Sequence, residues 1–195
     1  AGPPGRIVFL RQTQPGKFAV EMRRDIRKLA ASSAAFTLAD ISGDGKPELV
    51  SVIGGEPAIW PIEKFTLGSV RKYPAGASIV GVVVADYDGD GMQDLAGISP
   101  DDAAPVRIWF GRKGESGVAP GPQTIFEMPP IIEFQAVGRR GSTASRIAVV
   151  ERNARRIVLY DLELEAVAGK GDRDAPFTVH GFPDPGQRNR AWAMV

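Results

Sequence analysis

An internal repeat constrains the fold of this chain more than any other feature of its sequence. The segment 36–50, whose acidic part reads ADISGDGKPEL, returns at 82–96 as ADYDGDGMQDL. Asp40 and Asp86, which occupy the same place in the two copies, are 46 residues apart. Around both copies the apolar residues form short β-rich runs between Gly, Pro, Asp and Asn clusters, and amphipathic helix patterns are scarce. This pattern predicts an all-β repeat protein.

Each full repeat contains four short β-rich stretches. They lie at 36–39, 49–53, 58–60 and 70–73 in the first copy, and at 82–85, 95–98, 106–110 and 124–127 in the second. A weaker third copy begins near 134–138 and continues through 146–150 and 156–160. Four short strands in a period of this length are typical of the blades of a β-propeller.

The sequence therefore predicts a single β-propeller region over 1–195, made of blades of four antiparallel strands. We expect about three full blades with partial blades at both ends. Residues 5–30 are expected to be the end of a preceding blade, and 34–76 and 79–130 to be two full blades. Residues 131–183 are expected to form a degenerate blade, and 189–195 the first strand of a next blade. Because an incomplete blade exposes unpaired strand edges, we expect a fragment of a larger propeller, or one completed by another chain.

Both copies of the repeated segment carry oxygen-bearing side chains at the first, third, fifth and ninth positions of a loop. These residues are Asp40, Ser42, Asp44 and Glu48 in the first loop, and Asp86, Asp88, Asp90 and Asp94 in the second. Glycines at the fourth and sixth positions permit the positive-φ turns that fold carboxylates inward. Clustered carboxylates repel one another unless a cation neutralises them, and hard oxygen ligands in a flexible loop suit Ca²⁺. We predict up to two calcium sites, with the backbone carbonyls of Lys46 and Met92 at the seventh position as further ligands.

An EF-hand is the main alternative for such a loop. It requires a bidentate glutamate at the twelfth position and a helix on either side. The twelfth positions here are Ser51 and Gly97, and β-rich runs flank both loops. The sequence therefore argues against an EF-hand.

The two acidic segments resemble FG-GAP repeats, also called VCBS-type repeats, as in the propeller of integrin α chains. The resemblance covers most of the chain through the repeat spacing, and its specific motif occurs twice. It implies a calcium loop between two strands of each blade, with ligands at positions 1, 3, 5, 7 and 9. Ser42 stands where Asp or Asn is usual, which implies stronger binding at Asp86–Asp94. In the third copy, Arg139 and Arg140 replace acidic residues, so we expect no metal there.

Composition narrows the possible functions. The chain has 195 residues, no cysteine, one histidine and a formal net charge of +1. Without cysteine, neither disulfides nor thiolate metal sites are expected. A net charge this close to zero gives no overall electrostatic attraction for nucleic acid, so binding of nucleic acid is not expected. The sequence contains no phosphate-cradling glycine loop, nucleophile elbow or zinc signature. We expect a protein that is not an enzyme, and His180 is interpreted as an ordinary structural residue.

The leading functional hypothesis is a secreted, periplasmic or cell-surface module that presents loops to a protein or glycan, with calcium in a structural role. One alternative is the propeller part of a carbohydrate-active enzyme such as a polysaccharide lyase. That alternative requires a long insertion rich in His, Lys, Arg or Tyr, which this stretch lacks. Another is a structural subunit of a surface assembly or filament. Trp60 and Trp109 occupy the same place in their repeats, which favours packing between blades over carbohydrate stacking.

Overall fold

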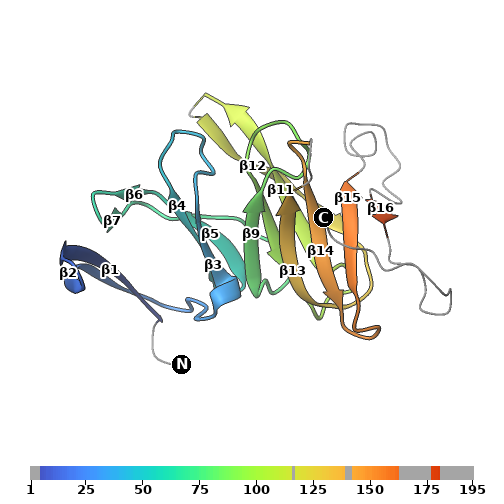
Figure 1. Cartoon of the computed structure of the whole chain (residues 1–195), viewed down its shortest axis with the longest axis horizontal. Helices are drawn as coiled ribbons and strands as arrows, with labels where there is room; N and C mark the ends of the chain where they lie inside the picture. Colours follow the sequence, from blue (N-terminus) through green and yellow to red (C-terminus); the bar gives the residue numbers. More distant parts are fainter. Residues whose placement is uncertain (1–4, 116, 139–141, 163–176, 181–195) are drawn as a thin grey trace.

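The protein is all-β, as the sequence predicts. The structure, a computed structural model, describes residues 5–115, 117–138, 142–162 and 177–180 (Figure 1). In these ranges every regular element is a strand except one 3₁₀ turn, Ser33–Ala35, and the strands pair in antiparallel fashion. None of the described residues belongs to a helix with the length and apolar character needed to span a membrane.

The described residues contain sixteen strands, which form three four-stranded sheets and two hairpins. The N-terminal hairpin contains β1 (Gly5–Gln14) and β2 (Lys17–Ile26). The first sheet contains, in spatial order, β3 (Phe36–Ala39), β4 (Glu48–Ile53), β5 (Glu56–Trp60) and β8 (Arg71–Lys72). A small hairpin of β6 (Ile62–Glu63) and β7 (Thr66–Leu67) is inserted between β5 and β8.

The second and third sheets repeat the same up-and-down order. The second contains β9 (Gly81–Ala85), β10 (Asp94–Ile98), β11 (Val106–Gly114) and β12 (Gly117–Phe126). The third contains β13 (Ile131–Gly138), β14 (Ser145–Glu151), β15 (Ile157–Leu162) and β16 (Phe177–His180). Figure 1 shows the sheets following one another along the long axis of the molecule in chain order.

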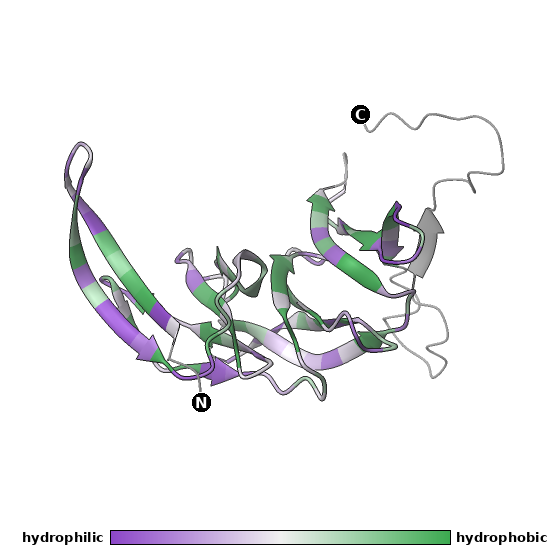
Figure 2. Cartoon of the chain, turned by 90° about the horizontal axis from the view of Figure 1, so that it is seen from below, coloured by the Kyte–Doolittle hydropathy of each residue, from purple (hydrophilic) through white to green (hydrophobic). Residues whose placement is uncertain are grey.

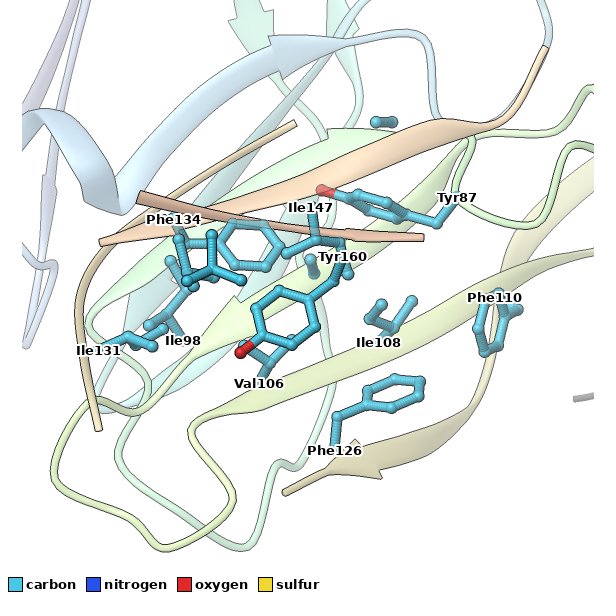
Figure 3. Packing of buried hydrophobic residues seen from close by; sticks show 14 residues of the cluster. Tyr87, Ile98, Val106, Ile108, Phe110, Phe126, Ile131, Phe134, Ile147 and Tyr160 are labelled. Carbon is cyan, nitrogen blue, oxygen red and sulfur yellow. The ribbon is translucent and has the colours of Figure 1, made fainter. Parts of the chain in front are cut away.

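Within the part of the chain that the structure describes, three clusters of buried apolar side chains join successive layers. The hairpin cluster lies between the N-terminal hairpin and the first sheet and includes Ile26, Leu49, Ile53, Ala58, Trp60 and Leu67. The middle cluster joins the first and second sheets and includes Val50, Val52, Ile59, Val82, Leu95 and Trp109. The C-terminal cluster joins the second and third sheets and includes Tyr87, Ile108, Phe126, Phe134, Ile147 and Tyr160 (Figure 3). Each inner sheet therefore buries apolar side chains on both of its faces, which explains its nearly continuous apolar strands.

The two repeated tryptophans occupy equivalent places in this packing. Trp60 lies opposite Leu49 in the first sheet, and Trp109 lies opposite Leu95 in the second. Both side chains are 3% exposed. Their burial between layers agrees with the packing role that their spacing indicates.

Tyr87 brings a polar atom into the C-terminal cluster. Its ring is 1% exposed and lies 6.2 Å from the ring of Phe134 in an edge-to-face arrangement. Among the described residues its hydroxyl group has no hydrogen-bond partner, and burial raises the pKa of this phenol well above its ordinary value. An unpaired buried hydroxyl costs free energy because it has left its hydrogen bonds with water.

We therefore expect Tyr87→Phe to raise the free energy of unfolding by about 1 kcal/mol. Urea denaturation measures the change. Tyr73→Phe is the matched control: Tyr73 is only partly buried, so this substitution should gain no comparable stability. A lower urea midpoint for Tyr87→Phe than for the wild type would contradict the unpaired hydroxyl.

Candidate metal-binding loops

The two acidic loops occupy the same place in successive sheets. The first loop, residues 40–48, connects β3 to β4, and the second loop, residues 86–94, connects β9 to β10. Their glycines have matching backbone angles, with φ of 71° and 84° at Gly43 and Gly45 and of 78° and 84° at Gly89 and Gly91. This confirms the prediction of positive-φ turns at the fourth and sixth positions, where a residue with a side chain would be strained.

The aspartate at the first position organises each turn. Asp40 accepts hydrogen bonds from the amides of Asp44 and Gly45, at 3.1 and 2.8 Å. Asp86 accepts them from the amides of Gly89 and Gly91, at 2.6 and 2.9 Å. These bonds bend the backbone around the carboxylate, so the side chains that follow are directed toward it.

The acidic residue at the ninth position closes each loop from the following strand. The carboxylate of Glu48 accepts hydrogen bonds from the amides of Ile41 and Ser42 at 2.9 and 3.2 Å, and from the Ser42 hydroxyl at 2.9 Å. In the second loop, Asp94 accepts a 2.7 Å hydrogen bond from the amide of Tyr87. Glu48 and Asp94 are both buried.

The carboxylates converge in two groups that could hold a metal ion. One group is Asp40, Asp44 and Glu48, and the other is Asp86, Asp88 and Asp94. Within each group, one oxygen from each residue lies within 4.8 Å of the others. In the part of the chain that the structure describes, these are the two places where three or more carboxylate, imidazole or thiol groups converge in this way.

Four other predicted ligands are not members of the two converging groups. The Ser42 hydroxyl is already hydrogen-bonded to Glu48 at 2.9 Å. The Asp90 carboxylate lies outside the converging group and accepts a 2.8 Å hydrogen bond from the amide of Met92. The seventh-position carbonyls of Lys46 and Met92 stay predictions. The backbone amides of these two residues donate hydrogen bonds to Asp44 and Asp90.

Burial in the second loop disfavours the ionised form of its carboxylates. The pKa of Asp94 is raised from 3.8 to about 7. Burial is the main cause and the charges of Asp88 and Asp86 add to it, while the amide hydrogen bonds of Gly111 and Tyr87 act in the opposite direction. Burial also raises the pKa of Asp88. A cation among these oxygens would stabilise their ionised forms, because it supplies the opposite charge at close range.

Strand β11 contributes two residues that the motif does not include. The amide of Gly111 donates a 2.7 Å hydrogen bond to the second oxygen of Asp94. The Nη1 atom of Arg112 lies 3.6 Å from Asp88 and 3.9 Å from Asp90. This guanidinium partly neutralises the second loop, a factor that the sequence-based ranking of the two loops did not contain.

Gly111 also carried a sequence signal that could have located this contact. A Cβ atom at this position would lie 2.7 Å from the carbonyl oxygen of Gln93 in the loop. A glycine inside a strand often marks such a close approach of two backbone segments. The first loop receives its basic residue locally instead, with Nζ of Lys46 3.8 Å from Asp44.

Each loop is also anchored to the sheet that follows it. The amide of Val118 in β12 donates a 3.1 Å hydrogen bond to the carbonyl of Ser42. In the second loop, the amide of Ser145 in β14 binds the carbonyl of Asp86 at 2.7 Å, and the Thr143 hydroxyl binds the carbonyl of Gly89 at 3.0 Å. The loops therefore lie at the junctions between sheets, and stiffening a loop would also stiffen a junction.

Other sequence predictions fall partly or wholly outside the described residues. The segment with Arg139 and Arg140, expected to carry no metal, lies there in part. The expected strand at 189–195 lies wholly outside the described residues. The backbone of His180 ends β16, in agreement with a strand end at that residue.

Comparisons with known proteins give no family assignment. No protein-family model matches the chain, and no curated protein matches it. A crystal structure of TcdB2-TccC3 without its hypervariable C-terminal region is similar over 72% of this chain and 7% of that one, at 17% identity and a TM-score of 0.45. A Photorhabdus luminescens Tc holotoxin pore with a TccC3 mutation is similar over 80% of this chain and 8% of that one, at 17% identity and a TM-score of 0.42. The chain thus spans less than a tenth of the length of either structure.

Proposed function

We propose that this chain is a calcium-stabilised part of a β-propeller and acts as a non-catalytic binding module outside the cytoplasm. The observation that carries the proposal is the convergence of Asp86, Asp88 and the buried Asp94 in a loop whose conformation is repeated 46 residues earlier. A repeated backbone conformation with converging carboxylates favours a repeated cation site over a chance cluster of acids.

The arrangement of the sheets supports the propeller part of the proposal. Each sheet is a four-stranded antiparallel meander in chain order, and successive sheets pack face to face through apolar clusters. Propeller blades have this topology and packing. The described residues form an open stack, so a closed ring would need further blades from elsewhere.

Calcium is the cation that best fits the oxygen ligands. The converging groups are carboxylates in glycine-bent loops, and Ca²⁺ accepts six to eight such oxygens with variable geometry. Backbone carbonyls and water would supply the remaining ligands. The proposed role is structural, because a cation that binds only the folded loop stabilises the fold by mass action.

Thermal unfolding with calcium and with EDTA tests the proposal. At a calcium concentration about 100-fold above the dissociation constant, a site contributes roughly 2.7 kcal/mol. For a chain of this size we expect a rise in Tm of about 5–10 °C.

Matched substitutions locate the effect. Asp88→Asn should lose much of the calcium-dependent rise in Tm. Asp101→Asn should keep it, because Asp101 is an exposed acid outside both loops whose ion pair with Arg152 is also at the surface. The proposal fails if wild-type Tm is the same in EDTA and in millimolar calcium.

A further inference from the structure

The second acidic loop has a basic side chain from another strand beside its carboxylates. The Nη1 atom of Arg112 in β11 lies 3.6 Å from an oxygen of Asp88 and 3.9 Å from an oxygen of Asp90. The side chain of Asp88 is only 10% exposed, whereas that of Arg112 is 52% exposed. A half-exposed guanidinium is therefore paired with a largely buried carboxylate, where water and salt screen the attraction less than at an open surface.

Contacts within β11 and with β12 fix the position of the Arg112 side chain. Its Nη1 atom donates a 2.9 Å hydrogen bond to the carbonyl of Gly111, and its Cζ atom lies 5.6 Å from the centre of the Phe110 ring. In the adjacent β12, a Cβ atom at Gly121 would lie 3.0 Å from Cγ of Arg112. Because residue 121 has no side chain, the stem of Arg112 can lie against the backbone of β12.

The corresponding position beside the first loop is not basic. Trp60 and Trp109 occupy the same place in their repeats, and the third residue after each is Glu63 in the first copy and Arg112 in the second. The first loop has Lys46 instead, whose Nζ lies 3.8 Å from a carboxylate of the same loop, and both side chains of this pair are more than half exposed. Such an open ion pair contributes little to stability. The two loops therefore differ in how their charge is balanced.

A cation held by Asp88 would share this carboxylate with Arg112. Two positive charges beside one carboxylate repel each other, and the repulsion is stronger where water is partly excluded. Since the arginine is attached to the fold, it is present beside the loop at every concentration of free ions. The guanidinium would have to move toward the solvent for a divalent cation to bind, and its 52% exposure leaves that direction open.

We propose that Arg112 is a tethered counter-cation of the second loop, which holds Asp88 and Asp90 in place without a metal ion and which a divalent cation must displace to bind. This role rests on the proposed calcium site and regulates it. The second loop then depends less on calcium than the first, and the junction that it anchors keeps its structure when calcium is scarce. The displacement also opposes the stronger binding at Asp86–Asp94 that the sequence motif implies.

Calcium titration by isothermal calorimetry tests the competition in the whole chain. Every protein compared carries Asp44→Asn, which removes one carboxylate from the first converging group, so that the titration reports mainly on the second loop. Arg112→Gln should tighten calcium binding about tenfold, because it removes a positive charge from beside the site. Arg11→Gln is the matched control: Arg11 pairs with Glu21 within the N-terminal hairpin, which projects from one end of the stack in Figure 2, and its loss should leave calcium affinity unchanged.

Thermal unfolding of the same proteins checks the role of Arg112 without calcium. In EDTA, Arg112→Gln should lower Tm by about 1–3 °C, because Asp88 and Asp90 lose their neutralising charge. In saturating calcium this difference should disappear, since the cation has then replaced the guanidinium. An unchanged Tm in EDTA would overturn the counter-cation role, and so would a loss of the same size in both conditions, which would assign Arg112 to packing alone.

The outcomes also separate this role from the calcium site itself. Equal calcium affinity with and without Arg112→Gln would overturn the competition and leave the site in place. Equal tightening by Arg11→Gln would show a general effect of net charge and would also overturn it. Calcium binding only in the Arg112→Gln protein would support the competition and reject calcium binding by the unaltered second loop. Binding in neither protein would overturn both the competition and the site.

Discussion

Without calcium, the protein is expected to lose stability as the pH rises from about 4 to about 7. The pKa of Asp94 is 3.8 in an ordinary setting and about 7 in the fold. Between these values the folded protein keeps a proton that the unfolded chain has released, so a rising pH favours unfolding. Asp102, whose pKa is lowered by the Ala104 amide and Arg107, acts in the opposite direction and mainly below pH 4.

Calcium should reverse this pH dependence. The cation binds the ionised carboxylates, so the difference in Tm between calcium and EDTA should be larger at pH 8 than at pH 5. Thermal scans at the two pH values, each with and without calcium, measure it.

An Asp94→Asn variant provides the control. It removes the titrating group, so in EDTA the decline in Tm from pH 5 to pH 8 should become smaller, even though the variant is less stable overall. A calcium effect of the same size at both pH values would contradict the role of a buried Asp94 in the site.

Trp109→Ala is expected to cause the largest loss of stability of any single substitution considered. The side chain is 3% exposed in the middle cluster, with its ring against the backbone of Gly97 and near Leu95. Truncating a buried tryptophan costs about 3–5 kcal/mol through lost burial and the cavity that remains. Since domains are stable by about 5–15 kcal/mol, much of the total would be lost.

Urea denaturation of two further variants keeps this prediction testable even if Trp109→Ala does not fold. Trp109→Phe leaves a smaller cavity and should be intermediate between the wild type and the alanine variant. Phe18→Ala, at a residue 62% exposed on the hairpin, should change stability far less. If Trp109→Phe and Phe18→Ala had the same small effect, the middle cluster would not be the main support of the stack.

The sequence predicted strands best where apolar runs lie between two layers. The predicted stretch 95–98 matches β10, Asp94–Ile98, almost residue for residue. β12 begins at Gly117, well before the predicted stretch 124–127. The prediction placed its start too late because Pro120 and Pro122 are typical of a loop. β12 is an edge strand, where a proline without an amide hydrogen is tolerated. That position depends on the tertiary arrangement, so local sequence could not indicate it.

The small β6–β7 hairpin was missed for a related reason. Its turn places Lys64 and Phe65 at φ of 46° and 64°, a conformation usually signalled by Gly or Asn. Neither residue marks such a turn in the sequence.

In the candidate site too, the residues whose roles depend on local sequence could be predicted and those that depend on tertiary contacts could not. Asp40, Glu48, Asp86 and Asp94 could be identified from the repeat, because their roles depend on positions within one loop. Arg112 could not, because its distance from Asp88 depends on the contact between β11 and the loop. Asp90 fits the motif, but the structure places its carboxylate on the Met92 amide, outside the converging group.

The anchoring of each loop to the following sheet has a consequence for biosynthesis. The carbonyl of Ser42 is bound by the amide of Val118, which is 76 residues later in the chain. Chains emerge from the ribosome N-terminus first, at about 5–20 residues per second. Val118 is therefore synthesised roughly 4 to 15 seconds after Ser42, and the first loop lacks this hydrogen bond until then. Each acidic loop is fully anchored only after the following repeat has been translated.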